Sequence, residues 1–244
     1  MCFSAEASFA AGTALLAAGV YCLAKASRCG RRCLPLAAVP LLFGLQQLAE
    51  GFVWLGLDNP AAPATRAAAL VFLFFALAFW PVWMPFSACF LTSGRWRHLC
   101  AILTGAAFGF LIFLYGPILL EAGRYLTVRQ VHHSLLYDYD SLPIYEVISQ
   151  PMLRLLYLLA VAVPLTILAF TMPPLKGVAI AYAVGTGISF LAFEHAFVSV
   201  WCFFAAIATL GLLWTFRRLP ACNWPTNAYH DCAKFHVPGA GYPC

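Results

Sequence analysis

The feature that most constrains this chain is a series of apolar runs, each about as long as a helix that crosses a bilayer. Such a helix needs about 20 predominantly apolar residues. Runs of about that length recur over residues 8–24, 34–57, 67–91, 99–120 and 153–172. A further run over 178–216 is about twice as long as one span requires at a rise of about 1.5 Å per residue. We expect it to hold two helices with a turn near Glu194 and His195. The sequence therefore predicts an all-α, polytopic membrane protein built as a bundle of seven transmembrane helices.

Composition excludes the other broad classes of protein. Hydrophobic residues make up 63% of the chain and charged residues 9%, against roughly 45–50% and about 25% in soluble domains. So few charges could not cover the surface of a soluble globule, and so much apolar mass excludes intrinsic disorder. The net charge of +5 lies in short clusters beside the apolar runs. We therefore expect membrane lipids as partners, no nucleic acid, and a location in the cell membrane as a multi-pass protein.

Lysine and arginine orient the predicted helices, because cytoplasmic connections carry an excess of both. Of the 14 Lys and Arg residues, ten lie on one predicted side and four on the other, namely Arg66, Arg124, Arg129 and Arg154. This bias predicts an N-terminus outside and a C-terminus in the cytoplasm. The predicted organisation is one seven-helix domain over 1–216, with an outer loop over 121–152. A flexible cytoplasmic tail that contains Cys and His follows over 217–244.

The outer loop is the one sizeable piece that we expect outside the membrane on that face. Residues 125–139 are rich in Tyr, Val and Leu and alternate in part between apolar and polar side chains. This pattern predicts a short hairpin or a lid over the mouth of the bundle. His132 lies within the stretch and is a candidate metal ligand. An interfacial aromatic belt is the simpler explanation of the tyrosines around it.

Glu50 is the charged residue whose position most needs an explanation, because it lies inside the second apolar run. An ionisable group in the hydrocarbon costs several kcal/mol unless it is paired, coordinated, protonated or in contact with water. Gln47, Glu50 and Trp54 follow i, i+3, i+7 spacing, so they share one helix face. We expect this face to point into the bundle. Glu194 and His195 lie at a similar depth, so we expect Glu50 to share an outward-facing pocket with His195.

Three explanations of this polar cluster stay open: a structural cluster, a metal or catalytic site, and a proton or ion path. A metal site would draw on Glu50, Glu194 and His195 together with Cys2 or His132, and these ligand types suit zinc or another divalent transition metal. An enzyme built on it would carry out metal-assisted hydrolysis of a lipid or small amphiphile, with Glu50 or Glu194 as the base. The alternatives are a proton- or solute-coupled carrier or channel, and a structural or receptor-like subunit of a membrane complex.

Cysteines and small residues add two further expectations. Eight of the ten cysteines fall at or near the predicted cytoplasmic face, so we expect mainly free thiols. Small residues at four-residue spacing permit close helix approach. They occur as Ser4, Ser8 and Gly12 in the first span and as Ala181, Gly185 and Ser189 in the sixth. We interpret these ridges as packing within the bundle, and a homo-oligomer stays open.

The opening residues Met1-Cys2-Phe3-Ser4-Ala5, followed by Ala7-Ser8-Phe9, resemble the start of an uncharacterised family of prokaryotic multi-pass membrane proteins. The chain is also similar to that family at 40–43, at Gln46-Gln47 with Glu50-Gly51 and Trp54, and near Glu194-His195. The resemblance covers about residues 1–216, and the tail departs from the pattern. It implies a membrane protein with a domain of unknown function and supplies no activity. It does single out Cys2, Glu50 and the Glu194-His195 pair as residues to test together.

Overall fold

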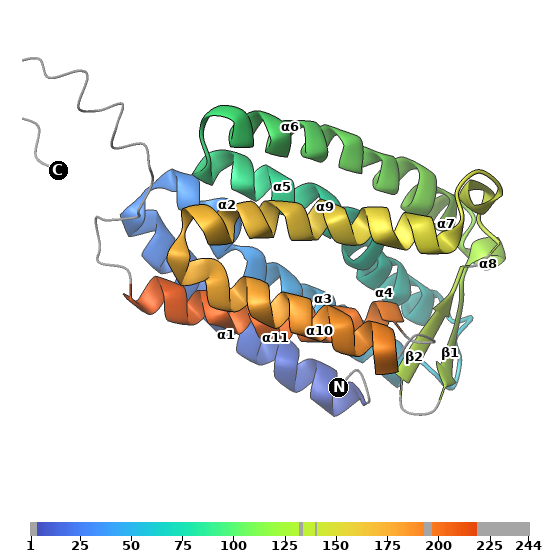
Figure 1. Ribbon diagram of the computed structural model, residues 1–244. Helices are drawn as coiled ribbons and strands as arrows, with labels where there is room; N and C mark the ends of the chain where they lie inside the picture. Colours follow the sequence, from blue (N-terminus) through green and yellow to red (C-terminus); the bar gives the residue numbers. More distant parts are fainter. Residues whose placement is uncertain (1–3, 132–133, 140, 193–196, 219–244) are drawn as a thin grey trace, which may run out of the picture.

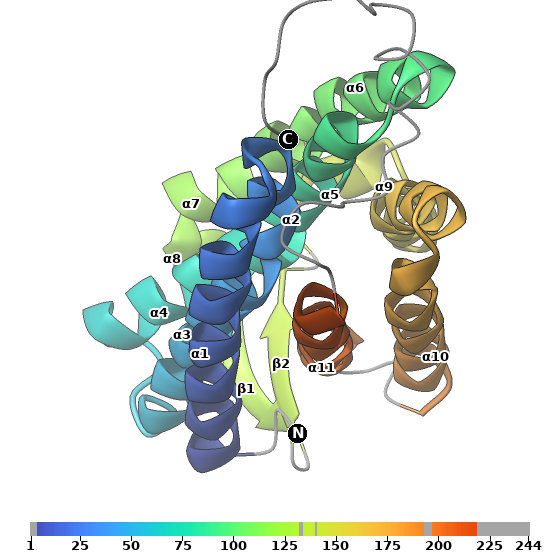
Figure 2. The same ribbon diagram turned by 90° about the vertical axis from the view of Figure 1, so that its left-hand side faces the viewer.

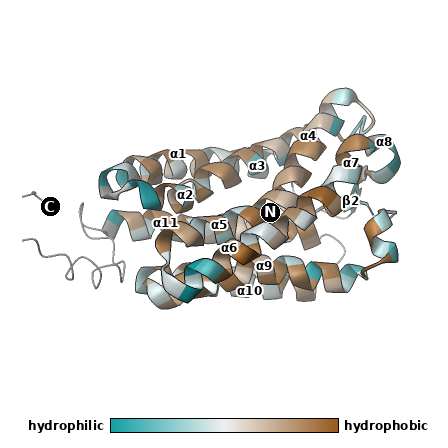
Figure 3. Cartoon of the chain, turned by 90° about the horizontal axis from the view of Figure 1, so that it is seen from above, coloured by the Kyte–Doolittle hydropathy of each residue, from teal (hydrophilic) through white to brown (hydrophobic). Residues whose placement is uncertain are grey.

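The computed structural model describes residues 4–131, 134–139, 141–192 and 197–218. Within these ranges, seven helical segments are long and apolar enough to cross a membrane, which confirms the predicted all-α bundle (Figure 1). The segments are Ala5–Arg28, Arg31–Leu55, Pro63–Leu91, Gly94–Leu120, Gln150–Thr171, Pro173–Ala192 and Phe197–Arg217. Two of these segments, Pro173–Ala192 and Phe197–Arg217, share the long run over 178–216, as its length predicted. Hydrophilic residues gather toward the two ends of the bundle (Figure 3).

Several spans consist of more than one helical element. The first span is α1 (Ala5–Cys29), and the second combines η1 (Arg31–Cys33), α2 (Leu34–Ala37) and α3 (Val39–Leu55). The third combines α4 (Pro63–Leu73), η2 (Phe74–Phe79) and α5 (Trp80–Leu91). The fourth combines α6 (Gly94–Gly109), η3 (Phe110–Tyr115) and α7 (Gly116–Leu120). The last three are α9 (Gln150–Thr171), then η5 (Pro173–Leu175) with α10 (Lys176–Ala192), and α11 (Phe197–Arg218).

The elements η2 and η3 are π-helical turns that pack against each other in the middle of neighbouring spans. Each ends two residues before a proline, Pro81 after η2 and Pro117 after η3. A proline inside a helix removes one backbone donor and its ring crowds the carbonyl four residues earlier. A wider turn just before the proline accommodates both effects. Such turns occur often at functional sites.

Small residues hold the spans close together, as their spacing predicted. A Cβ built at Gly19 of α1 would collide with the backbone of Leu41 in α3, and one built at Gly12 would lie 2.8 Å from Leu48. In the sixth span, a Cβ at Gly185 would lie 2.6 Å from the Cβ of Phe204 in α11. Both ridges therefore serve packing inside the bundle.

The connection between the fourth and fifth spans holds α8 (Ala122–Tyr125), a β-hairpin and η4 (Pro143–Glu146). Strand β1 (Thr127–Val131) pairs antiparallel with β2 (Ser134–Asp138), in a register that sets Thr127 opposite Asp138. Strand β2 faces the bundle, because Leu135 and Tyr137 are buried and the Tyr137 ring stacks on Phe72 at a centroid distance of 4.8 Å. The predicted hairpin over 125–139 is thereby confirmed. It crosses one end of the bundle, which we call the hairpin end (Figure 1).

Candidate functional site

The polar residues of α3 point into the bundle, as predicted for a stripe in the hydrocarbon. Gln46, Gln47 and Glu50 are each fully buried. The Trp80 indole N–H donates a hydrogen bond of 2.7 Å to the Gln46 side-chain oxygen. The Ser199 hydroxyl of α11 donates one of 2.6 Å to Glu50 Oε1, and Gln47 Nε2 donates a longer one of 3.4 Å to Glu50 Oε2. The polar side chains of α3 therefore contact two different spans: Gln46 contacts α5, and Glu50 contacts α11.

Four of the residues predicted to join Glu50 in a site lie outside the described residues. They are Cys2, His132, Glu194 and His195. The proposed pairing of Glu50 with His195, and the metal site built on it, therefore stay predictions. Within the described part of the chain, no cluster of three or more His, Cys, Asp or Glu side chains could hold a metal ion. Among the described cysteines, Cys22, Cys89, Cys100 and Cys202 are free thiols, as expected.

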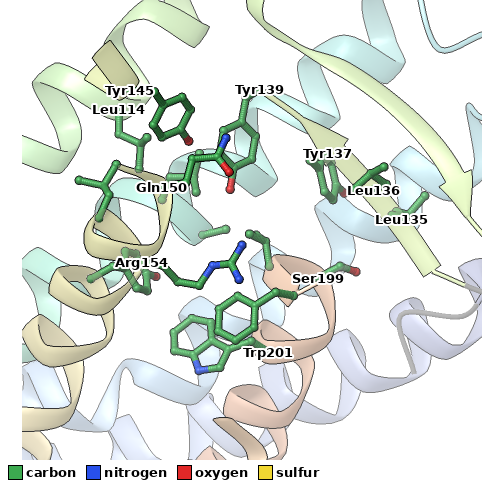
Figure 4. A pocket seen from close by; sticks show the side chains of 16 residues that line it. Leu114, Leu135, Leu136, Tyr137, Tyr139, Tyr145, Gln150, Arg154, Ser199 and Trp201 are labelled. Carbon is green, nitrogen blue, oxygen red and sulfur yellow. The ribbon is translucent and has the colours of Figure 1, made fainter. Parts of the chain in front are cut away.

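A cavity of about 270 Å³ lies at the hairpin end of the bundle (Figure 4). Its wall comes from six parts of the chain. These are the two π-helical turns, strand β2, the segment that follows it, the first two turns of α9, and the first turn of α11. The residues concerned are Ala76, Leu77, Leu114, Leu135, Leu136, Tyr137, Tyr139, Tyr145, Gln150, Leu153, Arg154, Tyr157, Phe197, Val198, Ser199 and Trp201. The hairpin therefore forms one wall of a cavity, and its role as a lid stays a prediction.

Arg154 places a positive charge inside this cavity. Its guanidinium group extends among the lining side chains, with Tyr139, Tyr145 and Gln150 on one side and Trp201 on the other (Figure 4). The group lies over the Phe197 ring, 4.9 Å from its centroid. Neither of the two ion pairs found among the described residues includes Arg154. No carboxylate among the described residues pairs with this half-buried guanidinium, and a charge at the end of an apolar span is expensive to maintain unless it is paired or binds an anion.

Two other lining residues, Tyr157 and Ser199, are buried. The Tyr157 ring is buried, and its hydroxyl has no hydrogen-bond partner among the described residues. Ser199 lines the cavity, but its hydroxyl points away from Arg154 (Figure 4) and donates to Glu50. Glu50 consequently lies behind the cavity wall, in contact with it through Ser199.

The sequence interpretation missed most of this cavity. Arg154 was used only to orient the helices, although a cation within an apolar run is itself a signal of a functional group. Ser199 and Trp201 gave no such signal, because a serine and a tryptophan in an apolar helix are common in packed cores. Tyr139 and Tyr145 were assigned to an interfacial belt.

Seven apolar spans and a charged cavity at one end define this chain as a multi-pass helical membrane protein. It belongs to a family of unknown function, DUF6629, whose family model matches residues 1–227. This confirms the resemblance to an uncharacterised membrane family. No curated protein and no solved structure shows significant similarity to the chain.

Proposed function

We propose that this chain binds a small amphiphile with an anionic head group, and that Arg154 is the charge partner of that head group. The observation that carries the proposal is the Arg154 guanidinium inside the cavity, which no carboxylate pairs among the described residues. A guanidinium presents a planar fork of donors that matches a phosphate or a carboxylate in two parallel hydrogen bonds. The cavity wall lowers the local dielectric constant, so the attraction exceeds that at an exposed site.

The volume and the lining of the cavity favour an amphiphile over a small inorganic ion as the ligand. Its volume of about 270 Å³ is close to the lower end of the usual range for small-molecule sites, roughly 300–1,000 Å³. Around the cation, the lining combines tyrosine hydroxyls with leucine and aromatic faces. A ligand that has a charged head and an apolar body fits such a wall, and an ion that keeps its hydration shell does not.

We also propose that the cavity opens on the extracytoplasmic side. Among the described residues, the hairpin end carries the four cations Arg66, Arg124, Arg129 and Arg154, and the other nine Lys and Arg residues belong to the opposite end. This distribution supports an external hairpin end by the excess of positive charge in cytoplasmic connections. Membrane lipids of the outer leaflet, or amphiphiles that partition into it, would then reach the cavity directly.

Binding of dodecyl phosphate and dodecanoate to the purified full chain tests the proposal, with dodecyl trimethylammonium as the cationic comparison. A charge-assisted hydrogen bond contributes about 1.5–3 kcal/mol, so Arg154→Gln should weaken both anions about 10- to 150-fold. Arg66→Gln removes an exposed cation at the same end and should leave affinity unchanged. Equal affinity of the parent and Arg154→Gln for the two anions would overturn the proposal.

A second candidate function is hydrolysis of the bound amphiphile, as the sequence led us to predict. The contact between Glu50 and the cavity-lining Ser199 favours it, because it brings a buried carboxylate to the cavity wall. Glu50 or Glu194 would act as base, and Glu194, His195, Cys2 and His132 would hold zinc or another divalent transition metal. Metal analysis of the parent and of His195→Ala tests this, and a parent without stoichiometric metal would remove the metal-dependent version. The carrier and structural-subunit alternatives stay predictions.

A further inference from the structure

A second, smaller cavity lies deeper in the bundle, behind the one that contains Arg154. Its volume is about 40 Å³. Side chains from five spans line it: Leu36, Val39, Phe43, Trp80, Met84, Val161, Leu165, Leu175, Val178, Tyr182, Trp201, Ala205, Ala208, Thr209 and Leu212. None of these is charged. A void of this kind takes up apolar groups more readily than water, because water would find few hydrogen-bond partners in it.

Trp201 lies between the two cavities and lines both. It is almost fully buried, and its indole N–H donates a 3.0 Å hydrogen bond to Thr186 Oγ1. Its ring meets Tyr157 of the outer cavity edge to face at 5.4 Å and Tyr182 of the inner cavity at 5.7 Å. Among the described residues, Trp201 is the one side chain that lines both the charged cavity and the apolar one.

Two helices carry a continuous lining from the outer cavity to the inner one. On α9, the lining residues Arg154, Tyr157, Val161 and Leu165 recur at three- and four-residue spacing, so they form one face of the helix. The face changes along its length from a cation, through a tyrosine, to aliphatic side chains. The α11 lining repeats this spacing as Phe197, Trp201, Ala205, Ala208 and Leu212.

We propose that the ligand is a single-chain amphiphile whose chain runs past Trp201 and ends in the inner cavity, with the head group at Arg154. This rests on the proposed function and names its ligand class. Leu165 lies about 16 Å along α9 from Arg154, roughly the length of an extended chain of 12 carbons. A void needs about 10–15 Å³ to hold one water-sized group. The inner cavity has a volume of about 40 Å³, so it has room for about three groups of methylene size. The head and the rest of the chain occupy the outer cavity, where the Tyr157 hydroxyl, which has no hydrogen-bond partner among the described residues, supplies a second polar contact.

Chain-length selectivity tests this inference. The full chain is mixed with equimolar butyl, octyl and dodecyl phosphate in a neutral detergent, and the occupancy of each is read by native mass spectrometry. We expect the parent to prefer dodecyl over butyl phosphate about tenfold, because only the longer chain packs into the inner cavity. Ala208→Phe fills that cavity and should reduce the preference below about twofold with butyl phosphate binding unchanged. Ile207→Phe places the same aromatic side chain on an exposed face of α11 and should change nothing.

Ala208→Val serves if the larger substitution fails to fold, and it should move the preferred chain length from dodecyl to octyl phosphate. The inference is overturned if chain length makes no difference, or if Ala208→Phe and Ile207→Phe behave alike. Butyl phosphate binding that still depends on Arg154 would in that case leave the proposed function intact. Absence of Arg154-dependent binding at every chain length would instead remove the proposed function itself.

Discussion

The contact between Gln46 and Trp80 offers a quantitative test of how polar side chains are held inside this bundle. The Trp80 indole N–H donates to the Gln46 side-chain oxygen over 2.7 Å, and both residues are buried. The indole also stacks on Phe43 at a centroid distance of 3.8 Å. Trp80→Phe keeps an aromatic ring in this stack and removes the donor, so the Gln46 oxygen loses its partner.

The expected loss of stability in Trp80→Phe has two parts, the lost hydrogen bond and the cavity left by the smaller ring. A side-chain hydrogen bond between membrane helices contributes about 0.6 kcal/mol on average and about 1.7 at most, and a ring smaller by roughly 40 Å³ adds about 1 kcal/mol for the cavity it leaves. We therefore expect Trp80→Phe to lower the free energy of unfolding by about 2 kcal/mol. Gln46→Leu should cost less, because the Gln46 amide nitrogen has no hydrogen-bond partner in the described part of the chain and leucine removes it.

Equilibrium unfolding in lipid bicelles measures these energies for the parent, the two single variants and the double variant. The double variant should lose about 1 kcal/mol less than the sum of the single losses, because the shared hydrogen bond is counted twice in that sum. Trp83→Phe is the matched control, since its indole N–H donates to the Pro35 carbonyl oxygen at 3.1 Å. Its coupling to Gln46→Leu should be near zero. Additivity of Trp80→Phe and Gln46→Leu within about 0.3 kcal/mol would refute the reasoning.

Three further predictions follow from the packing and the orientation. Gly19→Ala should lower the free energy of unfolding by about 1–3 kcal/mol because its Cβ meets the α3 backbone, whereas Gly187→Ala, in open space, should not. Both effects are read from unfolding curves. Tyr137→Ala removes the ring that stacks on α4, so amide exchange over 127–138 should accelerate, as mass spectrometry would detect. In intact cells, an impermeant maleimide should label Glu146→Cys but not Arg95→Cys if the hairpin end is external; equal labelling would contradict that orientation.

The spans of this fold were predictable because membrane-crossing length is a property of the sequence alone. The number of residues in the run over 178–216 was sufficient to require a break, although no Gly or Pro marks its position. The same logic placed Glu50 inside the bundle, since an acid cannot face lipid. The π-helical turns were not predictable, because a proline near the middle of a span is compatible with a simple kink as well as with a wider turn.

The partners of the polar residues were beyond sequence reasoning for a different reason. Ser199 and Glu50 are separated by 149 positions, and only the packing of α11 on α3 brings them within 2.6 Å. Arg154 looked like an ordinary charge at the end of a span. Sequence alone does not distinguish a guanidinium that reaches the lipid head groups from one that enters a cavity, because both occur at that depth. In this fold the hairpin forms one wall of the cavity, so the Arg154 guanidinium lies inside a cavity.

The central claim is that an anionic head group contacts Arg154, and the distance between the two tests it most directly. Solid-state NMR recoupling between the phosphorus of dodecyl phosphate and ¹⁵N-labelled arginine side chains measures that distance in lipid bilayers. The account predicts a phosphorus to guanidinium nitrogen distance of about 4 Å or less, from a signal that disappears in Arg154→Gln and persists in Arg66→Gln. A short distance that survives Arg154→Gln, or no short distance to any arginine, would contradict it.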